Sequence, residues 1–307
     1  IPALTDPPLV AADEVTYLRD DSRIIGLVID GMAIAVPHNI LWWHEIANLN
    51  FSDRQVAVTF CPLTGSSLVF DRTALGGAEF GVSGLLFKNN LVMYDRRSDE
   101  SLWPQMVRAA GCGPSNGTSL PMAAALEMTW AGWRGLYPET RVVSGRTGFN
   151  RDYSPSGYPY GNYDRPDNPS VLFSLKIDQR RPPKERVLGI PGRTGGIAFP
   201  FGSLHNGAPF RVAHVTLDER AIVVFWDAAR QGAMAYDPVA GGETLGFEVR
   251  DDGIFDTSSG TRWLIDGRAD SGPLAGSRLT PIAEAYVAFW FAWAEFHPET
   301  ILWSPDS

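Results

Sequence analysis

The chain carries the stretch RIIGLVIDGMAIAVP at residues 23–37 and a second version of it, RVLGIPGRTGGIAFP, at residues 186–200. Each version begins with arginine, ends with proline and has glycine at its fourth position. The first version places Asp30-Gly31 between two apolar runs, which is the signature of a tight two-residue hairpin turn. The stretch therefore predicts a β-hairpin that occurs twice in the chain.

A second pair of similar stretches lies towards the end of each copy. Trp130 and Trp133 precede a Pro-Glu-Thr tripeptide, and Trp290 and Trp293 precede another one. Similarity over this length indicates duplication of a whole domain rather than a short solenoid repeat. We therefore predict a tandem duplication, in which differences between the copies point to function.

The duplication divides the 307 residues into four parts. Residues 1–19 form a Pro-rich N-terminal arm, residues 20–150 the first repeat, residues 151–183 a linker and residues 184–307 the second repeat. The linker places four tyrosines among Pro, Gly and Asn. Because rigid aromatic residues are unusual in a flexible tether, we expect it to pack over a surface as the wall of a cleft.

Most segments of each repeat are typical of strands. Val56–Phe60, Leu91–Tyr94 and Ala221–Phe225 are short apolar runs, rich in β-branched or aromatic residues and bounded by turns. Met122–Leu136 and Ile282–Phe296 have the aromatic spacing of a helix. We predict a mainly β fold of two antiparallel barrel- or sandwich-like domains with one aromatic-rich helix per copy.

Composition and charge exclude several classes of protein. The chain is 44% hydrophobic and 20% charged, as expected for a globular protein. Its net charge of −9 argues against nucleic acid or an anionic membrane as the main partner. The most apolar stretch, Ala285–Phe296, is too short for a transmembrane span. Because the chain begins with Ile1 rather than Met, we expect a removed export signal and a periplasmic or extracellular location.

The first repeat contains polar segments that the second repeat lacks. Cys61-Pro62-Leu63-Thr64-Gly65-Ser66 follows Phe60, whereas the segment after Phe225 begins with Trp226-Asp227. His44-Glu45 and the Asn89-Asn90 pair also have no clear counterpart. By contrast, His38 aligns with Phe201 and is expected to be structural. We predict that the unmatched segments converge beneath the linker in a site built from His44, Cys61, Thr64, Ser66 and Asn90.

Cys61 is the residue on which the chemistry of this site depends. With His44 and Met93 it offers the thiolate, imidazole and thioether ligands that suit copper. Blue-copper sites usually have a histidine shortly after the cysteine, but the next histidine after Cys61 is His205. A soft-metal site is therefore one of several interpretations.

A thiol enzyme is the second interpretation. Cys61 would be the nucleophile and His44 the base, with Glu45 or Asp95 to orient the histidine. The amides of the turn at residues 64–66 would then bind an anion or a developing oxyanion. A buried structural cysteine and a disulfide with Cys112 are the remaining alternatives.

Several motifs resemble one known family. They are Trp43-His44-Glu45-Ile46, Cys61-Pro62-Leu63-Thr64-Gly65-Ser66, Phe80-Gly81-Val82-Ser83-Gly84, Asn89-Asn90-Leu91-Val92-Met93-Tyr94-Asp95, Ser101-Leu102-Trp103, Pro159-Tyr160-Gly161 and Phe289-Trp290-Phe291-Ala292-Trp293. Together they resemble the prokaryotic domain-of-unknown-function family 3179, over nearly the whole chain. The family name carries no activity, but many members look exported, which implies an extracytoplasmic setting.

Two functions follow from these observations. The first is an exported protein that binds a small ligand through Glu45, Thr64, Ser66 and Asn90, or a soft metal such as copper, with redox or thiol chemistry at Cys61 and His44. The second is a non-enzymatic accessory or scaffold subunit of an extracytoplasmic or membrane-associated protein complex. The sequence leaves open whether the protein is an enzyme.

Overall fold

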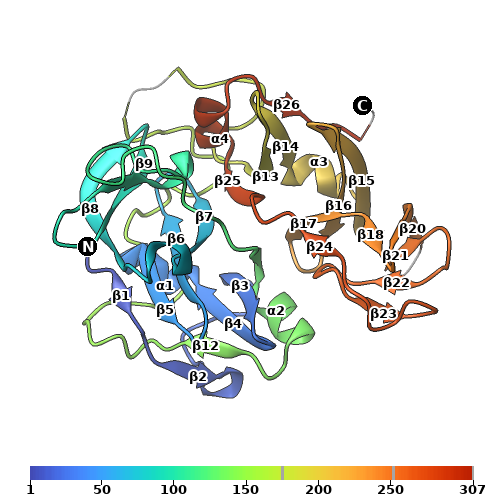
Figure 1. Cartoon of the computed structure of the whole chain (residues 1–307), viewed down its shortest axis with the longest axis horizontal. Coiled ribbons are helices and arrows are strands. Elements are labelled where there is room, and N and C mark those ends of the chain that lie inside the picture. The colour runs from blue at the N-terminus through green and yellow to red at the C-terminus, as the bar shows by residue number, and fades with distance from the viewer. Residues whose placement is uncertain (174–175, 251–252, 306–307) are drawn as a thin grey trace.

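The computed structural model describes residues 1–173, 176–250 and 253–305, and it has the predicted mainly β fold (Figure 1). We call residues 20–150 the first half and residues 184–307 the second half. The elements of the arm and the first half are β1 (Leu4–Thr5), β2 (Leu9–Ala11), β3 (Arg23–Ile29), β4 (Met32–Pro37), α1 (His38–His44), β5 (Ile46–Asn50), β6 (Gln55–Cys61), β7 (Ser66–Asp71), β8 (Phe80–Phe87), β9 (Asn90–Asp95), β10 (Leu102–Pro104), β11 (Leu126–Thr129), α2 (Trp130–Leu136) and β12 (Arg141–Val143).

The second half repeats much of this order. Its elements are β13 (Arg186–Pro191), β14 (Gly196–Pro200), α3 (Phe201–His205), β15 (Phe210–Leu217), β16 (Arg220–Asp227), β17 (Gly232–Asp237), β18 (Val239–Ala240), β19 (Glu243–Thr244), β20 (Phe247–Arg250), β21 (Gly253–Asp256), β22 (Arg262–Trp263), β23 (Ala269–Ser271), β24 (Thr280–Pro281), β25 (Tyr286–Phe289), α4 (Trp290–Phe296) and β26 (Ile301–Leu302). The described linker residues contain neither helix nor strand. The tandem duplication remains an interpretation of the sequence, with which this order agrees.

The predicted hairpin is present in both halves. β3 pairs antiparallel with β4 around Asp30 and Gly31, whose φ angles of 50° and 81° are those of a primed turn. β13 pairs in the same way with β14. The arm is also structured, because β1 pairs with β5 and β2 pairs with β12.

The expected long helices are shorter than the sequence indicated. In each half a strand, β11 or β25, occupies the segment just before the helix, and helices α2 and α4 begin at the first tryptophan. β11 pairs with β3, and β25 pairs with β13. The helical spacing of the tryptophans therefore covers only two turns, and sheet pairing determines the residues before them.

The two halves share one sheet. An eight-stranded sheet has the order β1-β5-β6-β7-β25-β13-β14-β26, and it passes between the halves where Ser67 on β7 pairs with Val287 on β25. The edge of each half is therefore covered by the other half, which removes two exposed edges. None of the helices in the described residues has the length and apolar character needed to cross a bilayer.

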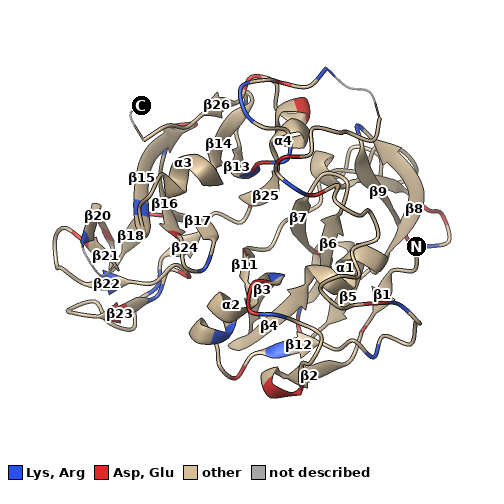
Figure 2. Cartoon of the chain, turned by 180° about the vertical axis from the view of Figure 1, so that it is seen from behind, with Lys and Arg blue, Asp and Glu red and all other residues tan. Residues whose placement is uncertain are grey.

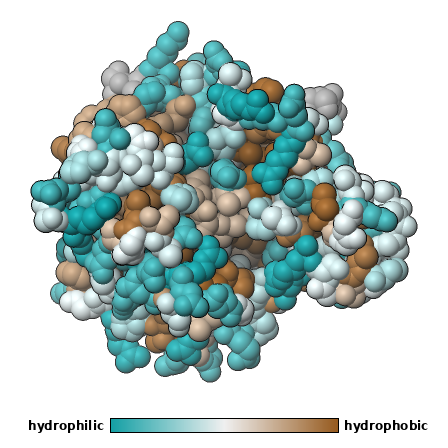
Figure 3. Space-filling view, viewed as in Figure 1, coloured by the Kyte–Doolittle hydropathy of each residue, from teal (hydrophilic) through white to brown (hydrophobic). Residues whose placement is uncertain are grey.

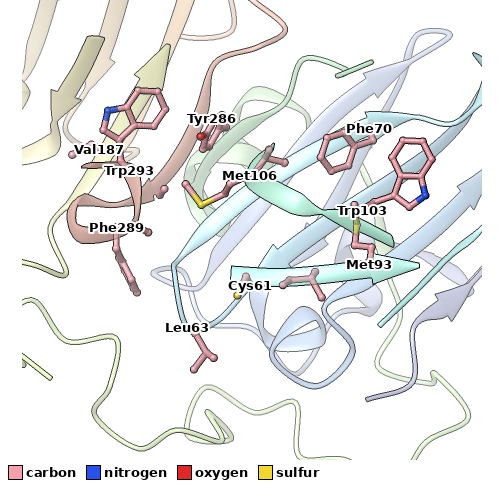
Figure 4. Packing of buried hydrophobic residues seen from close by; sticks show 14 of the residues in the cluster. Cys61, Leu63, Phe70, Met93, Trp103, Met106, Val187, Tyr286, Phe289 and Trp293 are labelled. Carbon is pink, nitrogen blue, oxygen red and sulfur yellow. The ribbon is translucent and has the colours of Figure 1, made fainter. Parts of the chain in front are cut away.

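The two halves also complete each other's cores. Trp290 and Trp293 of α4 belong to a buried cluster with Cys61, Leu63 and other side chains of the first half (Figure 4). Trp130 and Trp133 of α2 pack in a second cluster with side chains of the second half, among them Phe225, Tyr236 and Trp263. Two further clusters each remain within one half and its flanking segments. The hydrophobic effect therefore holds the halves together.

Glycine in the repeated hairpin is required by this packing. A Cβ atom on Gly26 would lie 2.3 Å from the ring carbons of Trp133, and one on Gly189 would lie 2.1 Å from those of Trp293. Real Cβ atoms do not approach this closely, so any side chain would displace the indole. Each tryptophan thus lies directly on the backbone of the β3 or β13 strand.

We expect Gly26→Ala to lower the free energy of unfolding by about 1–3 kcal/mol, because the added methyl group overpacks the contact with Trp133. Gly135→Ala is the matched control, because Gly135 lies in α2 and its added Cβ atom would meet nothing within 4 Å. That control is expected to be neutral or slightly stabilising. Urea denaturation followed by tryptophan fluorescence measures both changes, and equal stability of the two variants would contradict the assignment.

Candidate functional site

The turn between β6 and β7 carries the predicted site and lies beneath the linker. The hydroxyl of Tyr163 donates to the carbonyl oxygen of Leu63 at 3.0 Å, and that of Tyr158 donates to the carbonyl oxygen of Pro62 at 3.4 Å. Lys184 fixes the linker from the other side, since its Nζ donates to the carbonyl oxygens of Tyr163 at 2.9 Å and Ser170 at 2.5 Å. The linker is therefore an ordered cover over the turn.

Three of the predicted ligand-binding residues form a closed network with two further polar side chains. Asn90 Nδ2 donates to Thr64 Oγ1 and Ser66 Oγ, both at 3.0 Å, and to Gln105 Oε1 at 2.8 Å. Ser66 Oγ also donates to Gln105 Oε1 at 2.6 Å, and Gln105 Nε2 donates to Thr59 Oγ1 at 2.8 Å. All five side chains are fully buried and satisfy one another, so they brace the turn rather than face a ligand.

Sequence reasoning missed Gln105 in this network. Its backbone belongs to a short 3-10 helix after β10, and Asn90 Oδ1 accepts from the backbone N–H of the next residue, Met106, at 3.0 Å. A polar residue two positions after Trp103, in an otherwise apolar stretch, was the available signal. The prediction that Thr64, Ser66 and Asn90 converge agrees with the structure, but their role as ligand contacts is not supported by their burial.

Cys61 lies at the end of β6 with its thiol buried. Its Sγ is 3.8 Å from the carbonyl oxygen of Asn89, and the side chain is 1% exposed. Burial raises the pKa of Cys61 to about 11, and the neighbouring Glu45 carboxylate acts in the same direction. The thiol is therefore protonated at neutral pH, which is the opposite of an activated nucleophile. Both Cys61 and Cys112 are free, so the alternative of a disulfide between them is wrong.

His44 and Glu45 lie at the end of α1. His44 Nδ1 is 2.7 Å from the carbonyl oxygen of Pro2, and its Nε2 is 2.6 Å from the hydroxyl of Tyr153, so both ring nitrogens are engaged. Burial lowers the pKa of His44. Glu45 ends the helix with a φ of 58°, and burial raises its pKa to about 7. His44 is thus held by the arm and the linker and has no recorded bond to Cys61.

Met93 belongs to the core and not to a metal site. It lies on β9, paired with Trp103 of β10 and fully buried (Figure 4). Within residues 1–173, 176–250 and 253–305, no group of three or more His, Cys, Asp and Glu side chains is arranged to hold a metal ion. The geometry therefore gives no support to a copper site formed by Cys61, His44 and Met93.

A buried polar cluster surrounds Glu127, which sequence reasoning did not single out. Arg23 donates to Glu127 Oε1 through Nε at 3.0 Å and Nη2 at 2.7 Å, and Arg186 Nε approaches the same oxygen at 3.8 Å. Ser67 Oγ donates to Glu127 Oε2, and His38 Nε2 lies 3.5 Å from that oxygen. Burial would raise the pKa of Glu127, but Arg23 and its other neighbours hold it well below its usual range.

The cluster combines residues that the two copies share with residues that differ between them. Arg23 and Arg186 are the first residues of the two similar hairpins, so both copies supply an arginine. Glu127, however, aligns with Val287 when Trp130 is matched to Trp290, and His38 aligns with Phe201. Glu127 and His38 are therefore supplied to the cluster by the first copy alone, whereas each copy supplies one arginine. Comparing β11 with β25 residue by residue would have revealed Glu127.

Beside this cluster lies an open cleft of about 520 Å³, which is lined by the second half, the linker and Arg23 of the first half. We call it the charged cleft, and its defining residues are Arg23, Arg181, Lys184, Arg186, Phe201 and Trp226. Figure 2 shows the charged positions at the start of β3 and in the segment leading to β13, which contribute to this cleft. Burial lowers the pKa of Lys184 to about 8, so its amine is still mainly protonated at neutral pH.

The protonation state of Cys61 leads to a prediction. We expect a thiol reagent to modify exposed Cys112 rapidly at pH 7–8, whereas Cys61 reacts only after unfolding or as the pH approaches about 11. Mass spectrometry of Cys112→Ser, with and without denaturant, isolates the reaction at Cys61. Rapid modification of folded Cys112→Ser at pH 7 would instead favour the thiol-enzyme interpretation.

Comparison with known proteins gives a family but no activity. The model of the DUF3179 family, described as a protein of unknown function, matches residues 1–300. No curated protein and no solved structure matches the chain. Because the family model spans almost the entire chain, the resemblance of the sequence motifs is confirmed, and the protein belongs to the DUF3179 family.

Proposed function

We propose that the protein binds a small hydrophilic anion in the charged cleft. The observation that carries the proposal is the excess of positive charge in that cleft. Arg23, Arg181, Lys184 and Arg186 line it, and Glu185 is its only acidic lining residue within the described chain. In a protein with a net charge of −9, such a local excess of cations needs a physical explanation.

Ion pairs among the described residues do not neutralise this charge. Arg181 forms a close pair with Glu185, at 2.6 Å, and Arg23 forms a close pair with Glu127 beneath the cleft. Among the described residues, the one ion pair of Arg186 is the long 3.8 Å contact to the same Glu127 oxygen. Lys184 is fully buried, and its Nζ donates to backbone carbonyl oxygens of the linker, so its charge is directed away from the cleft. Three arginines therefore face two carboxylates. An anion in the cleft would relieve this imbalance through charge-assisted hydrogen bonds.

One wall of the cleft is aromatic. The rings of Phe201 and Trp226 make an edge-to-face contact with centroids 5.0 Å apart, and the Arg23 guanidinium lies 5.8 Å from the centre of the Phe201 ring. Aromatic walls exclude water and strengthen charge interactions beside them. A binding cleft with cations at one side and an apolar wall at the other is typical of small-molecule sites.

Ligand binding was the coarse expectation from the sequence, and the structure supports a different position for it. Redox or thiol chemistry at Cys61 would require an accessible thiolate. The thiol is buried with a raised pKa, and His44 uses both ring nitrogens elsewhere. The charged cleft offers accessible space and uncompensated charge, and it is therefore the better-supported site.

We expect Arg186→Gln to weaken anion binding by about 10- to 100-fold, because the variant loses one charge-assisted hydrogen bond to the anion. Titration calorimetry with phosphate, succinate and citrate as probes measures this change. Arg193→Gln is the matched control, since Arg193 is exposed and lies outside the lining of the cleft. Absence of binding by all three probes, or unchanged binding in Arg186→Gln, would contradict the proposal.

A second candidate function is an accessory subunit of an extracytoplasmic complex. One observation favours it, a strip of five exposed apolar side chains that we call the apolar strip: Leu85, Leu86, Phe87, Leu172 and Phe173. Asn89 joins its two segments, because its side chain exchanges hydrogen bonds with the backbone of Phe173 at 2.9 and 3.3 Å. Contiguous exposed apolar residues of this kind mark protein-binding surfaces. The extracytoplasmic setting rests on the family resemblance.

We expect the protein to co-purify at fixed stoichiometry with a partner from the extracytoplasmic fraction of its native host, and Leu86→Asp to abolish this. Val239→Asp is the control, because Val239 is similarly exposed, at 40% against 41%, but lies on β18 outside the strip. Monomeric behaviour of the wild type, or equal recovery of the partner with both variants, would count against the accessory role.

A further inference from the structure

A second cavity opens between the halves, distinct in its lining from the charged cleft. It has a volume of about 290 Å³ and lies between β3 and α2 of the first half and β17 and β24 of the second. Figure 3 shows a hollow lined with hydrophobic residues between the two halves. We call this cavity the apolar groove.

Small residues and one indole ring form the groove. The Trp133 ring lies on Gly26, so the strand provides a flat floor, and Ala124 and Ala125 leave space that larger side chains would fill. Met234 and Leu279 of the second half line the opposite wall and are almost fully buried. The hydrocarbon part of a ligand would therefore be enclosed by both halves and removed from water.

The other end of the groove is polar. Asp266 accepts a hydrogen bond from the Tyr137 hydroxyl at 2.7 Å and from Arg268 Nε at 2.6 Å, so its charge is already compensated. Arg278 also lines the groove and is exposed. Arg278 forms no ion pair with a carboxylate in the part of the chain that the structure describes. The Arg278 side chain does interact with the Tyr137 hydroxyl. The groove thus has an apolar body and, at its end, an exposed cation with a hydroxyl but no carboxylate as its partner.

We infer that the apolar groove is a binding site for a small amphipathic carboxylate, with a compact ring or branched hydrocarbon body and its carboxylate on Arg278. The volume is at the lower end of that of small-molecule pockets, which suits a body of about one ring. The enclosing walls come from both halves, which distinguishes the groove from a flat protein-binding surface. This inference is independent of the anion proposed for the charged cleft, because the two cavities share no lining residue.

The test uses the whole protein with benzoate and cyclohexanecarboxylate as probes, and benzyl alcohol and cyclohexylmethanol as their uncharged counterparts. Calorimetry and ligand-observed NMR give the affinities. Ala124→Phe fills the groove and is expected to abolish binding of all four probes. Ala74→Phe is the control and is expected to leave binding unchanged, because Ala74 is exposed in the first half and lies outside the groove. Circular dichroism shows that each variant is folded.

Arg278→Gln provides the second variant, because an exposed arginine is replaced without disturbing the core. It is expected to weaken binding of the two carboxylates by about tenfold and to leave the two alcohols unaffected. Arg186→Gln should leave all four affinities unchanged, since Arg186 lines the charged cleft and not the apolar groove.

Four results would overturn the inference. The first is that no probe binds the wild type at millimolar concentration, and the second is that folded Ala124→Phe binds the probes as the wild type does. The third is that Arg278→Gln loses affinity equally for the acids and the alcohols. The fourth is that Arg186→Gln loses affinity for the two carboxylates. The last result would assign the probes to the charged cleft. A concentration-dependent dimer that Ala124→Phe disrupts would instead identify the groove as a contact between copies.

Discussion

The arrangement of the two halves depends on one buried carboxylate. Glu127 is 3% exposed and accepts hydrogen bonds from Arg23 of its own half, while Arg186 approaches from the other half. A carboxylate removed from water is costly unless charges and hydrogen bonds compensate it, so Glu127 requires both neighbours in position. The ends of β3 and β13 are thereby fixed against each other. The charged cleft forms directly above this point, and its shape follows from that constraint.

Hydrophobic packing reinforces the same arrangement from both sides. The tryptophan pairs of α2 and α4 each enter a core that includes side chains of the opposite half. Backbone hydrogen bonds also join the two halves. The N–H of Phe289 donates to the carbonyl oxygen of Thr64, and the N–H of Thr129 donates to the carbonyl oxygen of Arg230. The polar network of Asn90 and Gln105 keeps the turn that carries Thr64 in place. The residues predicted as a ligand site thus act in the assembly of the two halves.

Much of the fold could be predicted from the sequence, because local patterns determine it. Asp30-Gly31 indicated its hairpin, and the tyrosines of the linker indicated a packed segment. The lengths of the helices could not be predicted, since pairing of β11 and β25 with distant strands overrides the spacing of the tryptophans. The sequence comparison set Phe60 against Phe225 and therefore Cys61 against Trp226, which is wrong by one residue. Cys61 pairs with Ser66 in its hairpin, and Asp227 pairs with Gly232 in the corresponding one, so Asp227 occupies the place of Cys61. The site was harder to predict, because Glu127, Arg23 and Arg186 converge only through tertiary contacts.

The completion of each core by the opposite half has a consequence for the duplication that the sequence predicts. A single repeat with this architecture would expose its tryptophan pair and would be stable only as a two-fold symmetric dimer. Joining two repeats through the linker makes their association intramolecular and independent of protein concentration. In a single chain, the residues at the two-fold axis between the repeats also no longer need to be identical. Glu127 and Val287 line the same small central cavity, where a homodimer would place two carboxylates that repel each other. A single chain can keep one carboxylate there, shared by two arginines, and so has an asymmetry that a symmetric homodimer could not hold.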